Sequence, residues 1–537
     1  MIIQRSIKRR LLRELRTRPA VYLGGPRQAG KTTLVQEIAR ENEGAGYFTF
    51  DDITTRGAAL NDPEGFLRSS QGLAILDEVQ LAPDVYRAVK LLIDERRAIA
   101  NERAFGSYLL TGSASAMALP TLSDALVGRM SILTLLPLSA AEAIGQHKPV
   151  INGLLDQDIG RKKIEQREKH RLDIGRIFAR AGFPELAANP STDRHTWFDG
   201  YLNSLIQRDV RELAQIDKLA SLPVLVQLLA LRAGALLNDA DCARDAGLSL
   251  STYRRYRALL EAVFLTVRVP PWFRNIGKRL VKSPKLYFTD TALLCHVLNA
   301  DPNSLRQANP ALFGRIVENF VATELMKQLS LFSGAALYHF RTHDGREVDF
   351  VIERRNGEIC GIEVKSRDHV ESRDFDGLRA LKDAAGEKFA RGIVFYLGSN
   401  ITPFGGDMFA VPLDLLWKLN MTVTTDKDIR CSDKLNGSVL FWAKYGERTR
   451  IRCIVERETI EDYFHDGASD AQSVAAIERQ WETIWPIFVQ KIEEGRIEKI
   501  LHDNGPGIIT GRYQIILQAT LQPADFGECD FRQNSAA

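Results

Sequence analysis

The chain has 537 residues, too many for one hydrophobic core, so its length predicts several domains. Hydrophobic residues make up 45% and charged residues 26%, which is typical of globular protein and argues against disorder on a large scale. The net charge of +3 is too small to identify a partner, but it is uneven. Residues 421–537 hold 14 Lys and Arg against 19 Asp and Glu, a net of −5, which leaves +8 for the rest. A basic body with an acidic end restricts any nucleic-acid partner to the body.

The six cysteines are scattered, without a CxxC pair, which is typical of a reducing compartment rather than of a disulfide framework or a zinc site. The first fifteen residues predict a basic amphipathic helix and lack the apolar stretch of a signal peptide. No apolar run approaches the ~20 residues of a membrane-spanning helix. We therefore expect a cytoplasmic protein without a membrane partner.

Residues 1–144 alternate short β-rich apolar runs with helical stretches, the pattern of a parallel sheet with crossover helices. This pattern predicts one α/β nucleotide-binding domain with a parallel five-stranded sheet. The five expected strands are Ala20–Leu23, Tyr47–Phe50, Leu73–Leu76, Ser107–Thr111 and Ser131–Leu136.

A phosphate-binding loop follows the first of these strands. The residues from Gly25 to Thr32 fit GxxxxGK[ST], between a strand and a helix expected from Lys31 to Arg40. Glycines let backbone N–H groups surround a β-phosphate at a helix N-terminus, which favours negative charge. Lys31 would reach the β- and γ-phosphates, Thr32 would bind Mg²⁺, and the alternative is a glycine-rich turn with an accidental lysine. The expected nucleotide-binding residues are Gly25, Pro26, Arg27, Gln28, Ala29, Gly30, Lys31, Thr32, Thr33 and Asp77.

Polar residues at later strand ends complete this expected site for MgATP. Asp77 and Glu78 end the third strand, where Asp77 would hold Mg²⁺ through water and Glu78 would act as the base toward the attacking water. Ser113, after the fourth strand, is the candidate sensor of the γ-phosphate. Arg129, before the fifth strand, is either an arginine finger acting across a subunit interface or an exposed or salt-bridged arginine.

After a helical region, 145–218, residues 219–300 predict a winged-helix domain. Three helices, Leu222–Arg232, Asp239–Ala246 and Ser251–Glu261, precede two strands, Phe264–Val269 and Lys285–Phe288. Nine Lys and Arg and one acid lie between Ser251 and Lys285, which would place basic side chains on a recognition helix and a wing. The alternatives are a solvated basic face or an arm packed between domains. The candidate DNA contacts are Arg254, Arg255, Arg257, Lys278 and Arg279.

Residues 1–418 resemble the prokaryotic AAA-type P-loop ATPases that carry a C-terminal domain of unknown function with a restriction-endonuclease-like fold. In one place the chain departs from this pattern, because Asp124-Ala-Leu-Val precedes Gly128-Arg129 in place of the usual serine-leucine-alanine. The stretches that carry the resemblance are, in chain order, GGPRQAGKTTL, LAILDEVQLAPDVY, YLLTGSAS, LVGRMSILTLLPLSAAE, GFPE, YLNSLIQRDV, KSPKLYFTDTALL, GRIVENFVATEL, REVDFVIE and GIEVKS.

The resemblance implies that residues 310–418 form a nuclease-like α/β domain. A hairpin near Asn356 would bring Asp349 opposite Glu363, with Lys365 on the same polar face. Asp349 and Glu363, with Glu318 from the preceding helix, could hold a second Mg²⁺, and Lys365 could stabilise a phosphate, as in a D…ExK core. The alternatives are a solvated hairpin or a fold without activity.

Residues 421–521 predict an appended small α+β domain, with strands 437–442 and 450–455 and helices 457–464 and 473–495, followed by a disordered tail, 522–537. The whole chain supports two hypotheses. The first is an ATPase whose cycle drives a winged-helix and nuclease-like module on DNA. The second is a nucleotide-switch regulator that acts through protein partners, or as a homo-oligomer, with a silent nuclease-like domain.

Overall fold

The computed structural model describes most of the first 417 residues and short parts of the rest. The chain divides into two compact units, Met1–Lys418 and Leu419–Ala537, and each is described by itself. Described are residues 3–70, 72–100, 105–115, 128–145, 151, 174–180, 182–189, 191–211, 221–275, 282–332, 334–417, 423–425, 430–432, 438–445, 449–455, 474, 478, 498–500 and 516–521.

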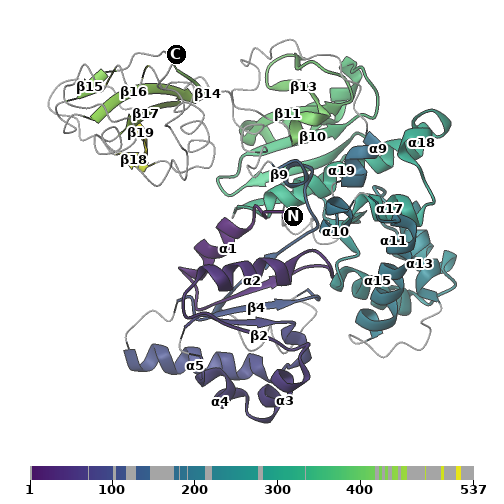
Figure 1. Cartoon of the computed structure of the whole chain (residues 1–537). Helices are drawn as coiled ribbons and strands as arrows, with labels where there is room; N and C mark the ends of the chain where they lie inside the picture. The colour runs from purple at the N-terminus through teal and green to yellow at the C-terminus, as the bar shows by residue number, and fades with distance from the viewer. Residues whose placement is uncertain are drawn as a thin grey trace. The chain divides into compact units, whose positions relative to one another are not determined.

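The first part of unit 1 is a parallel five-stranded sheet, as the sequence predicts, with helices on both of its faces (Figure 1). The strand order is β2-β3-β4-β1-β5. Every strand end lies within two residues of its expected position. The strands are β1 (Ala20–Gly24), β2 (Gly46–Thr49), β3 (Ala74–Asp77), β4 (Tyr108–Gly112) and β5 (Met130–Thr134). The carboxyl ends of β1, β3 and β4 therefore meet at one edge of the sheet.

Helices cover both faces of this sheet because its strands are apolar on both sides. In β1, Val21 and Leu23 pack against the α1 and α2 side, whereas Ala20 and Tyr22 pack against the α3, α4 and α5 side. Two separate cores result, one on each face (Figure 1). The helices are α1 (Lys8–Leu15), α2 (Lys31–Glu41), α3 (Ile53–Asn61), α4 (Pro63–Arg68), the short η1 (Val79–Leu81) and α5 (Val85–Ala100).

The middle of unit 1, which we call the second domain, is helical and ends in a two-stranded sheet. Its first helices are α7 (Ala140–Ala143), α9 (Ile174–Arg180), α10 (Pro184–Ala188), α11 (Arg194–Ser204) and the π-helical turn η4 (Leu205–Val210). Then come α13 (Leu222–Leu231), α14 (Asp239–Asp245), α15 (Leu250–Ala262), the antiparallel pair β6 (Thr266–Val269) and β7 (Lys285–Phe288), α17 (Thr291–Val297) and α18 (Pro302–Ala308). Asn238 and Ser249 start α14 and α15 by accepting backbone hydrogen bonds as N-caps. Three helices and a strand pair thus occur where they are expected, and the winged-helix interpretation stays a prediction.

The last part of unit 1, the third domain, is a six-stranded sheet in the order β12-β13-β11-β10-β9-β8. One core forms between this sheet and α20. The elements are α19 (Pro310–Leu329), β8 (Ala335–Arg341), β9 (Glu347–Arg354), β10 (Ile359–Val364), η6 (Ser372–Phe375), α20 (Asp376–Ala385), η7 (Gly386–Lys388), β11 (Phe389–Tyr396), β12 (Thr402–Pro403), β13 (Met408–Pro412) and η8 (Leu413–Leu416). That this sheet is a nuclease-like fold remains an interpretation.

Unit 2 is described through six strands and two further residues, 474 and 478. The strands are β14 (Val423–Thr425), β15 (Arg430–Ser432), β16 (Ser438–Tyr445), β17 (Thr449–Val455), β18 (Glu498–Ile500) and β19 (Ile516–Leu521). The strand pair expected near 437–455 is β16 and β17, which are antiparallel. The helix expected at 457–464 and the tail 522–537 lie outside the described residues, and of the helix expected at 473–495 only residues 474 and 478 are described, both as helix. In the described part of the chain, every helix is too short or too polar to cross a membrane.

Candidate functional site

The phosphate-binding loop connects β1 to α2 and has a backbone that suits a bound anion. Gly30 adopts φ 91°, and Gln28 also has a positive φ, 60°, so the loop turns tightly before α2 begins. Gly25 lies against β5, because a Cβ placed there would be 2.2 Å from the carbonyl oxygen of Leu135. Thr32 and Thr33 are exposed in the first turn of α2. The loop therefore leads directly into a helix N-terminus, which favours a bound anion.

Lys31, Thr32 and Asp77 meet at the carboxyl edge of the sheet, as predicted. Lys31 is buried, and its Nζ donates to the carbonyl oxygens of Gly25 and Pro26, each at 3.0 Å. Burial lowers the pKa of Lys31, an effect that the nearby Glu78 and Asp77 oppose. Thr32 Oγ1 donates to Asp77 Oδ2 at 2.9 Å. A threonine hydroxyl beside a carboxylate is the donor set that Mg²⁺ of a bound nucleotide takes in P-loop proteins, so these residues fit that ion.

Two further residues, which the sequence did not single out, form hydrogen bonds to Asp77. Tyr47 donates its hydroxyl to Asp77 Oδ2 at 2.9 Å, and Thr111 donates to Asp77 Oδ1. The proximity of Asp77 and the burial of the ring raise the pKa of Tyr47 to about 12, with burial the larger cause. Both partners come from neighbouring strands, β2 and β4, on either side of β3. Asp77 is thus fixed in one orientation.

Glu78 and Ser113 are joined by Gln80, a residue that no sequence motif indicated. Glu78 has a left-handed backbone, φ 55°, and its N–H donates to Thr111 Oγ1 at 3.1 Å. Gln80 Nε2 donates to Glu78 Oε2 and, at 3.2 Å, to Ser113 Oγ. The expected base and the expected sensor therefore share one amide group. A strained backbone at a carboxylate, held by hydrogen bonds from its neighbours, is typical of a functional position.

Arg129 lies at the opposite edge of the sheet from this site. Its backbone carbonyl accepts from Ala20, at the start of β1, whereas the phosphate-binding loop follows the end of β1. The guanidinium makes a two-pronged ion pair with Asp94 of α5, at 2.8 and 2.9 Å. The side-chain hydrogen bond to Asp94 raises the pKa of Arg129. Within one chain Arg129 is a salt-bridged arginine, and its role as a finger toward a second subunit stays a prediction.

The loop is also tied to residues far along the chain. Arg5 donates to the carbonyl oxygens of Ala29 and Leu136, at 2.5 and 2.7 Å. Arg27, inside the loop, pairs through Nε with both carboxylate oxygens of Asp209 in η4, at 2.5 and 2.6 Å. Ser115, just after Ser113, donates its N–H to Ala262 O at the end of α15, at 2.8 Å. The nucleotide-site loops thus contact the second domain at both η4 and α15.

The structure changes the assignment of the basic residues in the second domain. Arg254 and Arg255 are exposed on α15, and Arg254 pairs with Asp239 at 3.0 Å. Arg257 is buried and pairs with Glu261 at 2.7 Å, so it does not belong to an exposed DNA-binding face. Lys285, the last of the nine basic residues expected on the recognition helix and the wing, is also buried. Lys278 and Arg279 lie outside the described residues.

The third domain brings Asp349 and Glu363 together as the hairpin predicts. The β9–β10 register pairs Phe350 with Ile362, so the next pair is Asp349 with Glu363. The Asp349 N–H donates to Glu363 Oε2 at 3.2 Å, and Val364 N–H donates to Asp349 Oδ2 at 3.0 Å. Lys365 Nζ lies 2.8 Å from Glu363 Oε1.

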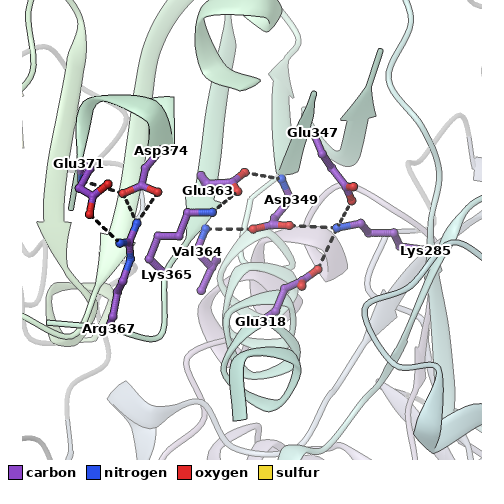
Figure 2. Close-up of polar contacts among 10 residues, drawn as sticks. All are labelled: Lys285, Glu318, Glu347, Asp349, Glu363, Val364, Lys365, Arg367, Glu371 and Asp374. Carbon is purple, nitrogen blue, oxygen red and sulfur yellow. Dashed lines mark hydrogen bonds and ion pairs between the residues drawn. The ribbon is translucent and has the colours of Figure 1, made fainter. Parts of the chain in front are cut away.

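The expected third carboxylate, Glu318, faces a lysine rather than a space for a metal ion (Figure 2). Lys285 Nζ is 3.0 Å from Glu318 Oε1, 3.0 Å from Asp349 Oδ1 and 2.7 Å from Glu347 Oε1. The Tyr287 hydroxyl donates to Glu318 Oε1 at 2.7 Å. No three His, Cys, Asp or Glu side chains among the described residues are placed to hold a metal ion. The second Mg²⁺ site expected at Glu318, Asp349 and Glu363 therefore does not fit this geometry, because Lys285 lies between two of the three.

Burial shapes the charge state of this cluster. Desolvation, reinforced by Asp349, raises the pKa of Glu363 to about 8 and that of Glu318 to about 7. Burial alone would lower the pKa of Lys285, but Asp349 and the groups around it raise it well above its ordinary value. His339, next to β9 on β8, is buried beside Lys285, and its pKa falls to about 4. Lys285 is thus a stable ammonium group among acidic side chains.

Comparison with known proteins identifies the first domain. Residues 17–144 match the model of an AAA domain, and residues 171–304 and 313–416 match two domains of unknown function, DUF8612 and DUF4143. The uncharacterized protein Rv2008c of Mycobacterium tuberculosis is 31% identical over 416 residues, which cover 77% of this chain and 84% of that protein. The uncharacterized protein Mb2031c of Mycobacterium bovis matches with the same values.

The solved structures are less similar to the chain in sequence than the two mycobacterial proteins are. The Walker-type ATPase PABY2304 of Pyrococcus abyssi has a TM-score of 0.34 at 12% identity, covering 55% of this chain and 96% of that one. Cdc6p from Pyrobaculum aerophilum has a TM-score of 0.22 at 12% identity, covering 56% and 93%. Because these scores are low, the relationship of the chain to known proteins rests on the matches in sequence.

Proposed function

This chain belongs to the family of the two mycobacterial proteins and carries an AAA-type ATPase domain, and from that premise we propose that it binds MgATP and hydrolyses it. The observation that carries the proposal is the meeting of Lys31, Thr32 and Asp77 at the strand edge, with the Thr32 hydroxyl 2.9 Å from the Asp77 carboxylate. Lys31 and Thr32 begin α2, and Asp77 ends β3, so the sheet brings the start of a helix and the end of a strand to one edge.

Each residue has a defined part in the proposed reaction. The backbone N–H groups of the loop surround the β-phosphate, and Lys31 neutralises the β- and γ-phosphates. Thr32 and Asp77 would hold Mg²⁺, which would supply positive charge to the phosphate oxygens when bound. Glu78, held by Gln80, takes the proton of the attacking water, and Ser113 contacts the γ-phosphate.

Glu78→Gln tests the assignment of the base. We expect this variant to bind a fluorescent ATP analogue as tightly as the wild type and to hydrolyse ATP about 10²–10⁴-fold more slowly, the usual contribution of general acid–base catalysis. Asp51→Asn, at an exposed carboxylate, is a matched control that should leave turnover unchanged. Wild-type turnover by Glu78→Gln would remove Glu78 from its proposed role.

The finer proposal is that the nucleotide cycle moves the second domain, and that this domain binds DNA. The ion pair between Arg27 and Asp209 and the hydrogen bond between Ser115 and Ala262 link the nucleotide loops to η4 and α15. Arg254 and Arg255, exposed on α15, are the DNA contacts of this proposal. It predicts ATP turnover that rises with DNA and a salt-dependent DNA affinity that Arg254→Ala and Arg255→Ala weaken.

One observation favours the second candidate, a nucleotide-switch regulator that acts through protein contacts. Lys285 lies between carboxylates of the third domain, where metal-dependent cleavage would need a cation. The two candidates differ in one assay. ATP turnover that does not respond to DNA, with no DNA binding at moderate salt, supports the regulator.

A further inference from the structure

The lysine in the carboxylate cluster comes from a different domain than the carboxylates. Lys285 begins β7 of the second domain, in the stretch that matches DUF8612, whereas Glu318, Glu347 and Asp349 belong to the stretch that matches DUF4143. Only 3% of the Lys285 side chain is exposed. A long amphipathic side chain is rarely so deeply buried unless its charge is paired, and here three carboxylates pair it.

The rest of β7 is attached to the same domain by hydrogen bonds. Asn319 of α19 is fully buried, and its side-chain amide accepts from the Phe288 N–H at 2.9 Å and donates to the Phe288 carbonyl at 3.2 Å. Tyr287 donates to Glu318 beside Lys285. Two adjacent side chains of α19 thus contact β7, Glu318 at Lys285 and Tyr287 and Asn319 at Phe288.

A second attachment lies just before the loop that leads into β7. Trp272 N–H donates to the carbonyl of His339 on β8 at 2.6 Å, and the His339 N–H donates to Pro270 O at 2.9 Å. The chain from Pro270 to Trp272 therefore runs along β8, next to the strand that carries Asp349. Gly234 also approaches from the second domain, since a Cβ there would meet the Glu318 carboxylate at 3.2 Å.

We infer that Lys285 takes the place of a divalent cation in the third domain, so that the carboxylates of Glu318, Glu347 and Asp349 form an inter-domain ionic lock and not a metal site. An ammonium group 2.7–3.0 Å from three carboxylates meets the same need for positive charge that Mg²⁺ meets in a metal-dependent nuclease. Unlike Mg²⁺, it offers no open coordination position for water or phosphate. The lock holds β7, and with it the second domain, on the third domain.

This inference is independent of ATP hydrolysis, because every group in the lock lies outside the nucleotide site. It also accounts for the buried acidic residues without an added ligand. A metal ion would have to displace the Nζ of Lys285 and move β7. The position of β7 is fixed by Asn319, which bonds both the N–H and the carbonyl of Phe288. The third domain would then act as a platform for the second domain rather than as a metal-dependent nuclease.

Binding of Mn²⁺ to the nucleotide-free full chain tests the lock, with free Mn²⁺ measured by electron paramagnetic resonance. We expect wild type and Asp349→Asn to bind the same number of Mn²⁺ ions. Lys285→Met should gain one ion per chain, because it removes the cation and keeps the length of the side chain, and the double variant Lys285→Met with Asp349→Asn should lose that ion again. Lys285→Arg retains a positive charge and should bind as the wild type does.

Two results would overturn the inference. One is a wild-type chain that loses one Mn²⁺ on Asp349→Asn or on Glu318→Gln, which would show a metal ion at these carboxylates. The other is a folded Lys285→Met chain that gains none. If Lys285→Met does not fold, the comparison of wild type with Lys285→Arg, Asp349→Asn and Glu318→Gln decides the matter, since equal Mn²⁺ binding by all four supports the lock and a lost ion refutes it.

Discussion

The ion pair between the phosphate-binding loop and η4 predicts an asymmetry between two single substitutions. The Arg27 side chain is 22% exposed and that of Asp209 only 6%. Removing one partner or the other should therefore change the free energy of unfolding by different amounts. Arg27→Gln removes the guanidinium that pairs with a buried carboxylate, which costs about 3 kcal/mol of folding free energy. Asp209→Asn leaves a guanidinium that can turn toward water, and we expect a cost of about 1 kcal/mol.

Thermal unfolding of the wild type, the two single variants and the double variant measures this difference in stability. At ~2 °C per kcal/mol for a large unit, Arg27→Gln should lower the melting temperature by ~6 °C and Asp209→Asn by ~2 °C. The melting temperature of the double variant should equal that of Asp209→Asn alone, because the double variant no longer contains the Asp209 carboxylate whose ion pair with Arg27 was removed. Equal effects of the single substitutions, or effects that add in the double variant, would refute the claim that this pair is buried and coupled.

Two other predictions concern a glycine and a histidine. Gly25→Ala should destabilise the first domain by about 1–3 kcal/mol, since the new Cβ would lie 2.2 Å from the Leu135 carbonyl oxygen. Gly57→Ala, a control in α3 with nothing within 4 Å, should be neutral or slightly stabilising, and urea unfolding compares the two. His339 has a folded pKa of about 4, below its ordinary value, because burial and Lys285 disfavour its charge. Its neutral form therefore stabilises the fold above the unfolded pKa, and that contribution is lost as the pH falls toward 4. Melting temperatures from pH 7 to pH 4.5 should fall less in His339→Gln than in the wild type, and parallel curves would contradict this reasoning.

The nucleotide site could be predicted because its signals are local. The loop from Gly25 to Thr32 is one continuous motif between a strand and a helix, and Asp77 and Glu78 follow directly after an apolar strand. Parallel pairing then brings these strand ends together without further information. The hairpin pairing of Asp349 with Glu363 was predictable for the same reason, since only a short turn separates the two strands.

Contacts between distant segments could not be predicted in this way. Lys285 is 64 residues from Asp349, and Arg27 is 182 residues from Asp209. In sequence, Lys285 ends a run of basic residues and so resembles a wing residue. The alternation of β7 does place Lys285 and Tyr287 on one face, but only the packing of β7 on α19 shows that this face is buried. Gln80 was missed because its role depends on the side chains of Glu78 and Ser113 meeting across two strands.

The central claim is that a triphosphate with Mg²⁺ binds in the loop beside Lys31 and is hydrolysed there. The most direct test is the steady-state release of phosphate from MgATP by the wild type and by Lys31→Ala, with Lys8→Ala, a lysine on the surface of α1, as the control. We predict turnover by the wild type and by Lys8→Ala, and neither binding nor turnover by Lys31→Ala. A Lys31→Ala chain that hydrolyses MgATP at the wild-type rate would contradict the account.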